Sequence, residues 1–269
     1  MQVLEEAVAQ TANPWPLRRE RAAELATRYP YADQMLTLYQ ALVSIQEAFY
    51  LEARSTELQP KDVPAFTVER VMPSVIDVTV ASGPAILRDG VLKVLCTADL
   101  SEIVRGWLDQ KPLNPFETYL ARASASPLLE ATKFPSPSGG GQGGGSSHTC
   151  PSCGGLPQLS YFAVSGEALV TGPRYLLCSH CANAWVFSRM TCANCGESDG
   201  GKLPIFQDSD QLTHIRIDGC RSCGKYLLTF DLRRDPKAVP IVDELAALPL
   251  DLYARDQGLT KITPNLMGN

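Results

Sequence analysis

Four C-x-x-C pairs stand out in this chain because the type and spacing of their residues suit metal binding. They hold eight of the nine cysteines: Cys150/Cys153, Cys178/Cys181, Cys192/Cys195 and Cys220/Cys223. Adding 42 to the first four positions gives the last four, so the stretch is a tandem repeat. The two residues inside each pair let the backbone turn and direct both sulfurs at one ion. Each repeat therefore predicts a tetrahedral site of four thiolates.

The four pairs can be matched in three ways. Sequential matching respects the repeat and closes two loops of 24 residues each, a symmetry that a cross-braced arrangement would not use. The metal ligands that we predict are Cys150, Cys153, Cys178 and Cys181 in site 1, and Cys192, Cys195, Cys220 and Cys223 in site 2. Gly154, Gly196 and Gly224 follow three of the pairs, and glycine lets the chain curl back so that amide N–H groups reach sulfur. Ala182 takes that position after the remaining pair.

The donor sets predict two bound metal ions. Iron and zinc both accept four thiolates, and the residue types do not separate them. A redox-active C-x-x-C pair usually lies at the start of a helix, which lowers the thiol pKa. The pairs in this chain lie in strand-rich sequence and do not resemble such a redox pair. A closed tetrathiolate site has no open coordination position, so we predict no catalytic residue. A module of about 42 residues is near the size that needs a metal to fold, so we expect the metal to hold each module together.

Short β-rich runs lie between the cysteine pairs and predict ribbons folded around metal. They are Leu159–Val164, Tyr175–Leu177, Trp185–Phe187, His214–Ile217 and Tyr226–Phe230. Beyond them, Pro240 to Gly258 has apolar residues at helical spacing, interrupted by Pro249, and predicts a helix that caps the modules. His148 and His180 adjoin cysteine pairs, but eight thiolates already complete two sites, so we expect neither to be a ligand.

The N-terminal segment predicts helices. An apolar stripe with a helical period runs from Ala32 to Glu52, and a shorter one over Pro16–Arg28. Asp99 and Asn114 precede two further helices, each with an acidic residue three positions later, which is a capping pattern. The stretches between residues 62 and 95 are rich in Val, Pro and Gly and remain ambiguous.

Four further side chains have simple structural interpretations. Cys96 ends the run Val91–Leu95, and a lone cysteine in such a run is usually a buried small hydrophobe. Trp185 is expected in the core. Arg189 and Arg233 each lie near the end of a repeat's last strand. They are either surface charge or docking contacts, and we favour surface charge.

The sequence as a whole predicts an α+β protein in five parts. Pro135 to Ser147 reads PSPSGGGQGGGSS and predicts a flexible tether. The expected parts are a helical domain at 1–134, this linker at 135–147, two tandem rubredoxin-like or zinc-ribbon modules at 148–191 and 192–234, and a C-terminal helix and tail at 235–269.

Composition and charge argue against several classes of protein. The hydrophobic content of 45% is that of a globular chain, with a net charge of −5. Residues 148–234 carry 8 Lys/Arg against 7 Asp/Glu, which is not the basic stripe of a nucleic-acid module. The N-terminus MQVLEEAVAQ lacks the pattern of a signal peptide, and no apolar run approaches the ~18 residues of a membrane span. We therefore expect a cytoplasmic protein, where paired cysteines indicate metal more often than disulfides.

Two stretches resemble the FdhE family of formate dehydrogenase accessory proteins. They are GPRYLLCSHCANAWVFSRMTCANCG at Gly172–Gly196 and CRSCGKYLLTFDLRRDP at Cys220–Pro236. The resemblance is close from Cys150 onwards, includes all eight paired cysteines, and departs from the family in the glycine-rich tether. It implies a cytoplasmic, non-enzymatic protein with a helical N-terminal part, two rubredoxin-like modules and two bound iron ions, with zinc as the alternative. It also implies binding to the catalytic subunit of formate dehydrogenase during maturation.

The leading hypothesis is therefore a maturation factor with a scaffold held by two tetracysteine metal sites. The first alternative is a rubredoxin-like electron carrier, which requires a reversible one-electron couple. The second is a zinc-ribbon nucleic-acid-binding protein, which requires salt-dependent affinity for DNA or RNA.

Overall fold

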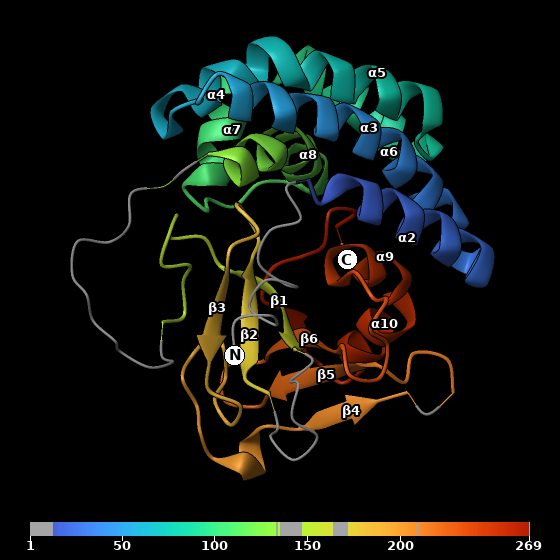
Figure 1. Ribbon diagram of the computed structural model, residues 1–269, viewed down its shortest axis with the longest axis vertical. Helices are drawn as coiled ribbons and strands as arrows, with labels where there is room; N and C mark the ends of the chain where they lie inside the picture. Colours follow the sequence, from blue (N-terminus) through green and yellow to red (C-terminus); the bar gives the residue numbers. More distant parts are fainter. Residues whose placement is uncertain (1–12, 133, 135–146, 164–171, 209, 269) are drawn as a thin grey trace.

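A layer of helices packs on one end of a mixed β-sheet, and two C-terminal helices lie beside that sheet (Figure 1). The structure is a computed structural model, and it describes residues 13–132, 134, 147–163, 172–208 and 210–268. The predicted tether at 135–147 lies, except for Ser147, outside the described residues. The α+β class and the order of helical part, cysteine modules and C-terminal helices are as predicted.

The described N-terminal part consists of helices joined by short turns. Its helices are α2 (Trp15–Arg28), α3 (Asp33–Ser55), α4 (Val63–Phe66), a π-helical turn at Thr67–Val71, α5 (Met72–Ser82), α6 (Ala85–Thr97), α7 (Leu100–Leu108) and α8 (Pro115–Ala131). The two predicted stripes correspond to α2 and α3. The ambiguous stretches form α4 to α6, and Gly83–Pro84 separates α5 from α6 because proline cannot continue the preceding helix.

Two predicted caps begin α7 and α8. The Asp99 carboxylate accepts the backbone N–H groups of Ser101 at 2.8 Å and Glu102 at 3.2 Å. Asn114 accepts from the N–H of Glu117 at 3.0 Å, and the Glu117 carboxylate accepts the Asn114 N–H at 3.0 Å. This reciprocal capping box satisfies backbone donors that have no partner within the helix.

The prediction that Cys96 is buried is wrong. Residues 85–97 form a helix whose buried face carries Val91 and Val94, and Cys96 is exposed. A helix turns about 100° per residue, so a position two after Val94 points away from the core. Gly90 lies on the inner side of the same helix, where a Cβ atom would come within 2.4 Å of the Phe116 ring.

The two modules form a single sheet with the strand order β3-β2-β1-β6-β5-β4. Its strands are β1 (Pro157–Phe162), β2 (Arg174–Cys178), β3 (Ala184–Phe187), β4 (Ile205–Gln207), β5 (Ile215–Cys220) and β6 (Lys225–Asp231), with β7 (Thr260–Lys261) parallel to β6. Each predicted β-rich run overlaps one strand. β1 and β6 join the modules by parallel pairing, with Ser160 opposite Thr229 and Phe162 opposite Asp231.

The modules share a core with helices from both ends of the chain. Leu159, Ile217 and Leu228 are fully buried in a cluster that also contains Leu25 of α2 and Val242 of α9. The predicted C-terminal helix is two helices, α9 (Pro240–Ala246) and α10 (Leu248–Asp256), which divide just before Pro249. These contacts tie the cysteine modules to the rest of the chain. Within the described part of the chain, every helix is too short or too polar to cross a membrane.

Candidate metal centres

The four sulfurs of site 1 lie close enough together to surround one ion. Cys150 Sγ and Cys181 Sγ are 3.8 Å apart, and Cys153 Sγ and Cys178 Sγ are 3.4 Å apart. A tetrahedral ion with metal–sulfur bonds of about 2.3 Å requires sulfurs about 3.8 Å from each other. The donor set and its spacing therefore fit a tetrathiolate metal.

Site 2 repeats this geometry. Cys192 Sγ and Cys223 Sγ are 3.8 Å apart, and Cys195 Sγ and Cys220 Sγ are 3.7 Å apart. In each group all four ligand atoms lie within 4.8 Å of one another. The cysteines are thus grouped sequentially rather than cross-braced, and all nine, each of which the structure describes, are free of disulfides.

Backbone turns after each pair hold the sulfurs in place. The residue that follows the second cysteine adopts a positive φ in every pair: 77° at Gly154, 52° at Ala182, 79° at Gly196 and 66° at Gly224. The N–H of Gly154 then donates to the Cys150 carbonyl at 2.9 Å. Backbone N–H groups also reach sulfur, from His180 to Cys178 at 3.4 Å. The glycines are needed because side chains rarely adopt this conformation.

Ala182 is the one non-glycine residue among these four turns, and it provides a test of backbone strain. Replacing Ala182 with glycine is expected to raise the free energy of unfolding by about 0.5–1 kcal/mol, because the left-handed conformation is unfavourable for alanine. Denaturant unfolding of the metal-loaded protein measures the change. Gly154→Ala is the matched opposite variant, because a Cβ there meets no atom within 4 Å and only the backbone is strained. The strain explanation is wrong if both substitutions shift stability in the same direction.

The protonation of site 1 shows why a cation is needed. The Cys153 contact alone would raise the pKa of Cys150, but the Cys178 and Cys181 contacts outweigh it and lower that pKa to about 6. Contact with Cys150 first, and then with Cys153, raises the pKa values of Cys178 and Cys181. Without a cation, two sulfurs therefore keep their protons. A metal ion stabilises all four thiolates together.

The two sites differ in their surroundings. In site 1, Cys150, Cys178 and Cys181 are buried and belong to the same apolar cluster as Trp107 of α7. The His180 ring contacts the Trp107 ring, with centroids 4.3 Å apart and ring planes tilted by 44°. Site 2 has an exposed cysteine at Cys195 and a half-buried one at Cys223. Site 1 therefore lies between the helices and the sheet, whereas site 2 is open to solvent at Cys195.

The remaining residues near the cysteine pairs have structural partners. His148 Nδ1 lies 3.0 Å from the Ala193 carbonyl, and His180 contacts Trp107, so the sulfur groups are complete without either ring. Trp185 is buried, as predicted, and its indole N–H donates to the Ser147 carbonyl at 2.9 Å.

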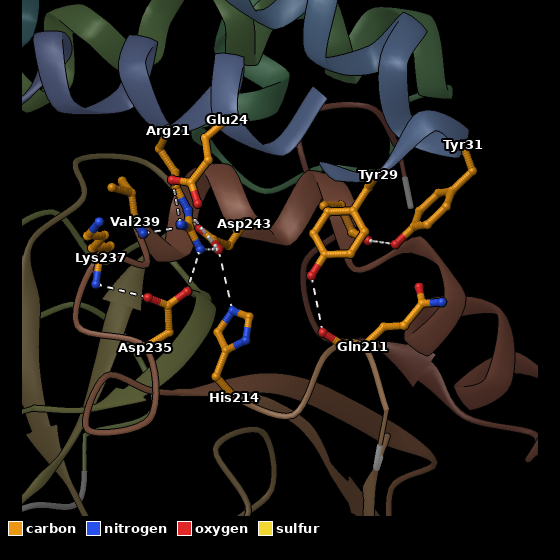
Figure 2. Close-up of polar contacts among 11 residues, drawn as sticks. Arg21, Glu24, Tyr29, Tyr31, Gln211, His214, Asp235, Lys237, Val239 and Asp243 are labelled. Atoms are coloured by element: carbon orange, nitrogen blue, oxygen red, sulfur yellow. Dashed lines mark hydrogen bonds and ion pairs between the residues drawn. The ribbon is translucent and has the colours of Figure 1, made fainter. Parts of the chain in front are cut away.

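A third group of potential ligands, His214, Asp235 and Asp243, is occupied by an arginine. Figure 2 shows Arg21 of α2 between Asp235 and Asp243, with His214 on the far side of Asp243. The Arg21 Nη2 atom lies 2.5 Å from Asp243 and 2.7 Å from Asp235. A guanidinium in contact with both carboxylates takes the place of a metal ion, so this group is a buried ion-pair network.

This network predicts how stability depends on pH. Burial alone would raise the pKa of Asp235, but the hydrogen bond from Arg21 outweighs burial and the pKa lies below its ordinary value. A lowered pKa in the folded state means that Asp235 contributes stability above about pH 4, and that this contribution is lost as pH falls through the folded-state value. Between about pH 6 and 3, we expect the free energy of unfolding to fall less in Asp235→Asn than in the original protein. An equal fall of unfolding free energy with pH in the variant and the original protein would contradict this.

Sequence reasoning missed this network and the contact between site 1 and α7. Arg21 and Asp243 are 222 positions apart, and no periodicity or motif connects them. The only available signal was a charged residue, Arg21, adjoining the apolar stripe of a predicted helix.

The fold and the two sulfur groups define a class: a protein with paired tetracysteine metal centres in a shared sheet beside a helical domain. Residues 149–189 match the family described as FdhE, central domain, and residues 190–267 match FdhE, C-terminal domain. The chain is therefore similar to the FdhE family over residues 149–267.

Individual relatives show the same similarity. A Protein FdhE homolog from Aquifex aeolicus is 38% identical over 119 residues, which are 44% of this chain and 41% of the relative. Protein FdhE of Escherichia coli is 34% identical over 116 residues, 43% of this chain and 36% of that protein. The matched stretch thus spans about two fifths of these relatives. The crystal structure of the FdhE protein from Pseudomonas aeruginosa superimposes with a TM-score of 0.66 at 23% identity, covering 94% of both chains, which shows a shared fold.

Proposed function

We propose that the protein is an accessory factor for the maturation of formate dehydrogenase and binds the catalytic subunit of that enzyme. The observation that carries the proposal is the match of residues 149–267 to FdhE domains over the stretch that holds both sulfur groups. The protein acts as a scaffold and not as an enzyme, because four thiolates around each ion leave no coordination position for a substrate. Its place of action is the cytoplasm, where thiols stay reduced.

Both sites hold iron in this proposal, as the family resemblance implies. The residues that hold the ions are Cys150, Cys153, Cys178 and Cys181 in site 1, and Cys192, Cys195, Cys220 and Cys223 in site 2. Iron would supply charge and fixed geometry, and the chain supplies the turns and N–H groups that orient the sulfurs. Metal analysis of protein purified without air, with its visible spectrum, checks the metal, because ferric tetrathiolate absorbs strongly and zinc is colourless.

Deletion and co-purification test the function. Deleting the gene is expected to abolish formate oxidation in the host, and tagged protein is expected to retain the catalytic subunit. Unchanged formate oxidation, together with no retained subunit, would overturn the proposal. A reversible one-electron couple at a physiological potential in such a protein would favour the electron-carrier alternative instead. Salt-dependent binding of DNA or RNA would favour the nucleic-acid alternative.

A further inference from the structure

Three arginines gather around a single aromatic ring at the end of β1. Phe162 is buried, and the guanidinium carbons of Arg189, Arg216 and Arg233 lie 4.8, 5.0 and 5.5 Å from its ring centroid. Arg189 and Arg233 each lie two residues beyond the last strand of their repeat, β3 and β6. The strand pairing of the shared sheet brings both to Phe162. They form one cluster, not two separate surface charges.

The cluster has more positive than negative charge. Arg174 lies opposite Phe162 in the pairing of β1 with β2 and is 3% exposed. It shares Asp218 with Arg216 at 3.2 and 2.8 Å. Arg233 pairs with Asp231 at 2.6 Å. Arg189 donates to the Gly172 carbonyl and has no carboxylate partner among the described residues. Among the residues that the structure describes, four arginines thus share two carboxylates, in a chain whose net charge is −5.

A pocket with an apolar rim adjoins these arginines. Arg174, Arg189 and Arg216 line it, and Asp218 is its only carboxylate among the described lining residues. Its rim includes Met190 and Ile205, which are 61% and 56% exposed. Guanidinium groups held against an aromatic ring suit carboxylates, and exposed apolar side chains beside them suit a partner's apolar residues.

We propose that this arginine cluster, with Met190 and Ile205, is a docking surface for an acidic segment of a partner protein that carries apolar side chains between its carboxylates. The inference rests on the proposed function in that an accessory factor has a protein partner. Charge complementarity supports this occupant, and the apolar rim favours a peptide over a free inorganic anion. The rival explanation is that the arginines only balance a negatively charged metal centre at site 2, because Cys192 also lines the pocket.

A peptide probe tests the surface with the full, metal-loaded chain. The probe is a fluorescein-labelled octapeptide of alternating glutamate and leucine, and binding is followed by fluorescence anisotropy. The double variant Arg189→Gln with Arg233→Gln is expected to bind about tenfold or more weakly, and the original protein to bind less tightly as salt is raised. A charge-matched control is Arg234→Gln with Lys237→Gln, because both residues are exposed and neither contacts Phe162. The control is expected to bind within about twofold of the original protein.

Three outcomes would overturn the docking surface. They are equal binding by the arginine variant, no binding by the original protein, and displacement of the peptide by millimolar inorganic phosphate at constant ionic strength. The first of these outcomes, if the variant also loses metal at site 2, would favour the counter-charge explanation. Failure of the formate dehydrogenase catalytic subunit to bind the original protein, with arginine-dependent peptide binding intact, refutes the proposed function and leaves the surface standing.

Discussion

Replacing Cys178 with serine is expected to reduce the metal content from about two ions to about one per chain and to destabilise the fold. A serine hydroxyl does not ionise near neutral pH and cannot replace a thiolate ligand. Structural tetrathiolate sites contribute on the order of 10–16 kcal/mol in small zinc peptides, and three remaining sulfurs keep only part of that. We expect the free energy of unfolding to fall by on the order of 5–10 kcal/mol. Metal analysis and denaturant unfolding measure the two effects.

Cys96→Ser is the matched control for this substitution. Cys96 is exposed and belongs to neither sulfur group, so the same chemical change there should leave metal content and stability unchanged. The location of site 1 adds a second readout. Because Cys178 and Trp107 share one apolar cluster, loss of the metal should also increase amide hydrogen exchange in α7. A Cys178→Ser protein that keeps two metal ions and normal exchange in α7 would refute the assignment of site 1.

The local features of this fold were predictable because their causes lie within a few residues. The caps at Asp99 and Asn114 depend on side chains that reach N–H groups two or three positions away. The turns at Gly154 and its three counterparts follow from the need for a positive φ after each cysteine pair. The grouping of the sulfurs followed from the repeat itself.

Features that depend on distant parts of the chain were not predictable. β4 and β7 have only three and two residues, too few for a pattern of alternation, and they exist because β5 and β6 offer pairing partners. Cys96 was placed wrongly because a run of apolar residues does not reveal its period until the helix packs. The burial of site 1 against α7 likewise depends on the way the helices pack on the sheet, which no single stretch encodes.

The ion-pair network of Figure 2 is a second point where distant segments of the chain meet. We expect one of its carboxylates, Asp243, to contribute most of its stabilisation. Arg21 and Asp243 have side chains that are 2% and 1% exposed, and Arg21 Nε also donates to Asp243 at 2.9 Å. The Asp243 carboxylate also accepts the Val239 N–H at 2.8 Å, which satisfies a donor at the start of α9. Asp243→Asn leaves a buried guanidinium without its closest counter-charge. We expect the free energy of unfolding to fall by about 3–5 kcal/mol, measured by denaturant unfolding.

Glu24 provides the matched control, because its carboxylate contacts the same guanidinium at 2.9 Å but its side chain is 48% exposed. Glu24→Gln is therefore expected to cost at most about 1 kcal/mol, since solvent screens an exposed pair. Equal costs for the two variants would show that burial of Asp243 is not what matters. Replacing both fully buried partners, Arg21→Met with Asp243→Leu, should recover most of the lost stability, because the one carboxylate left behind, Asp235, is 19% exposed and reached by solvent. That recovery would separate the cost of an unpaired charge from any loss of packing between α2 and α9.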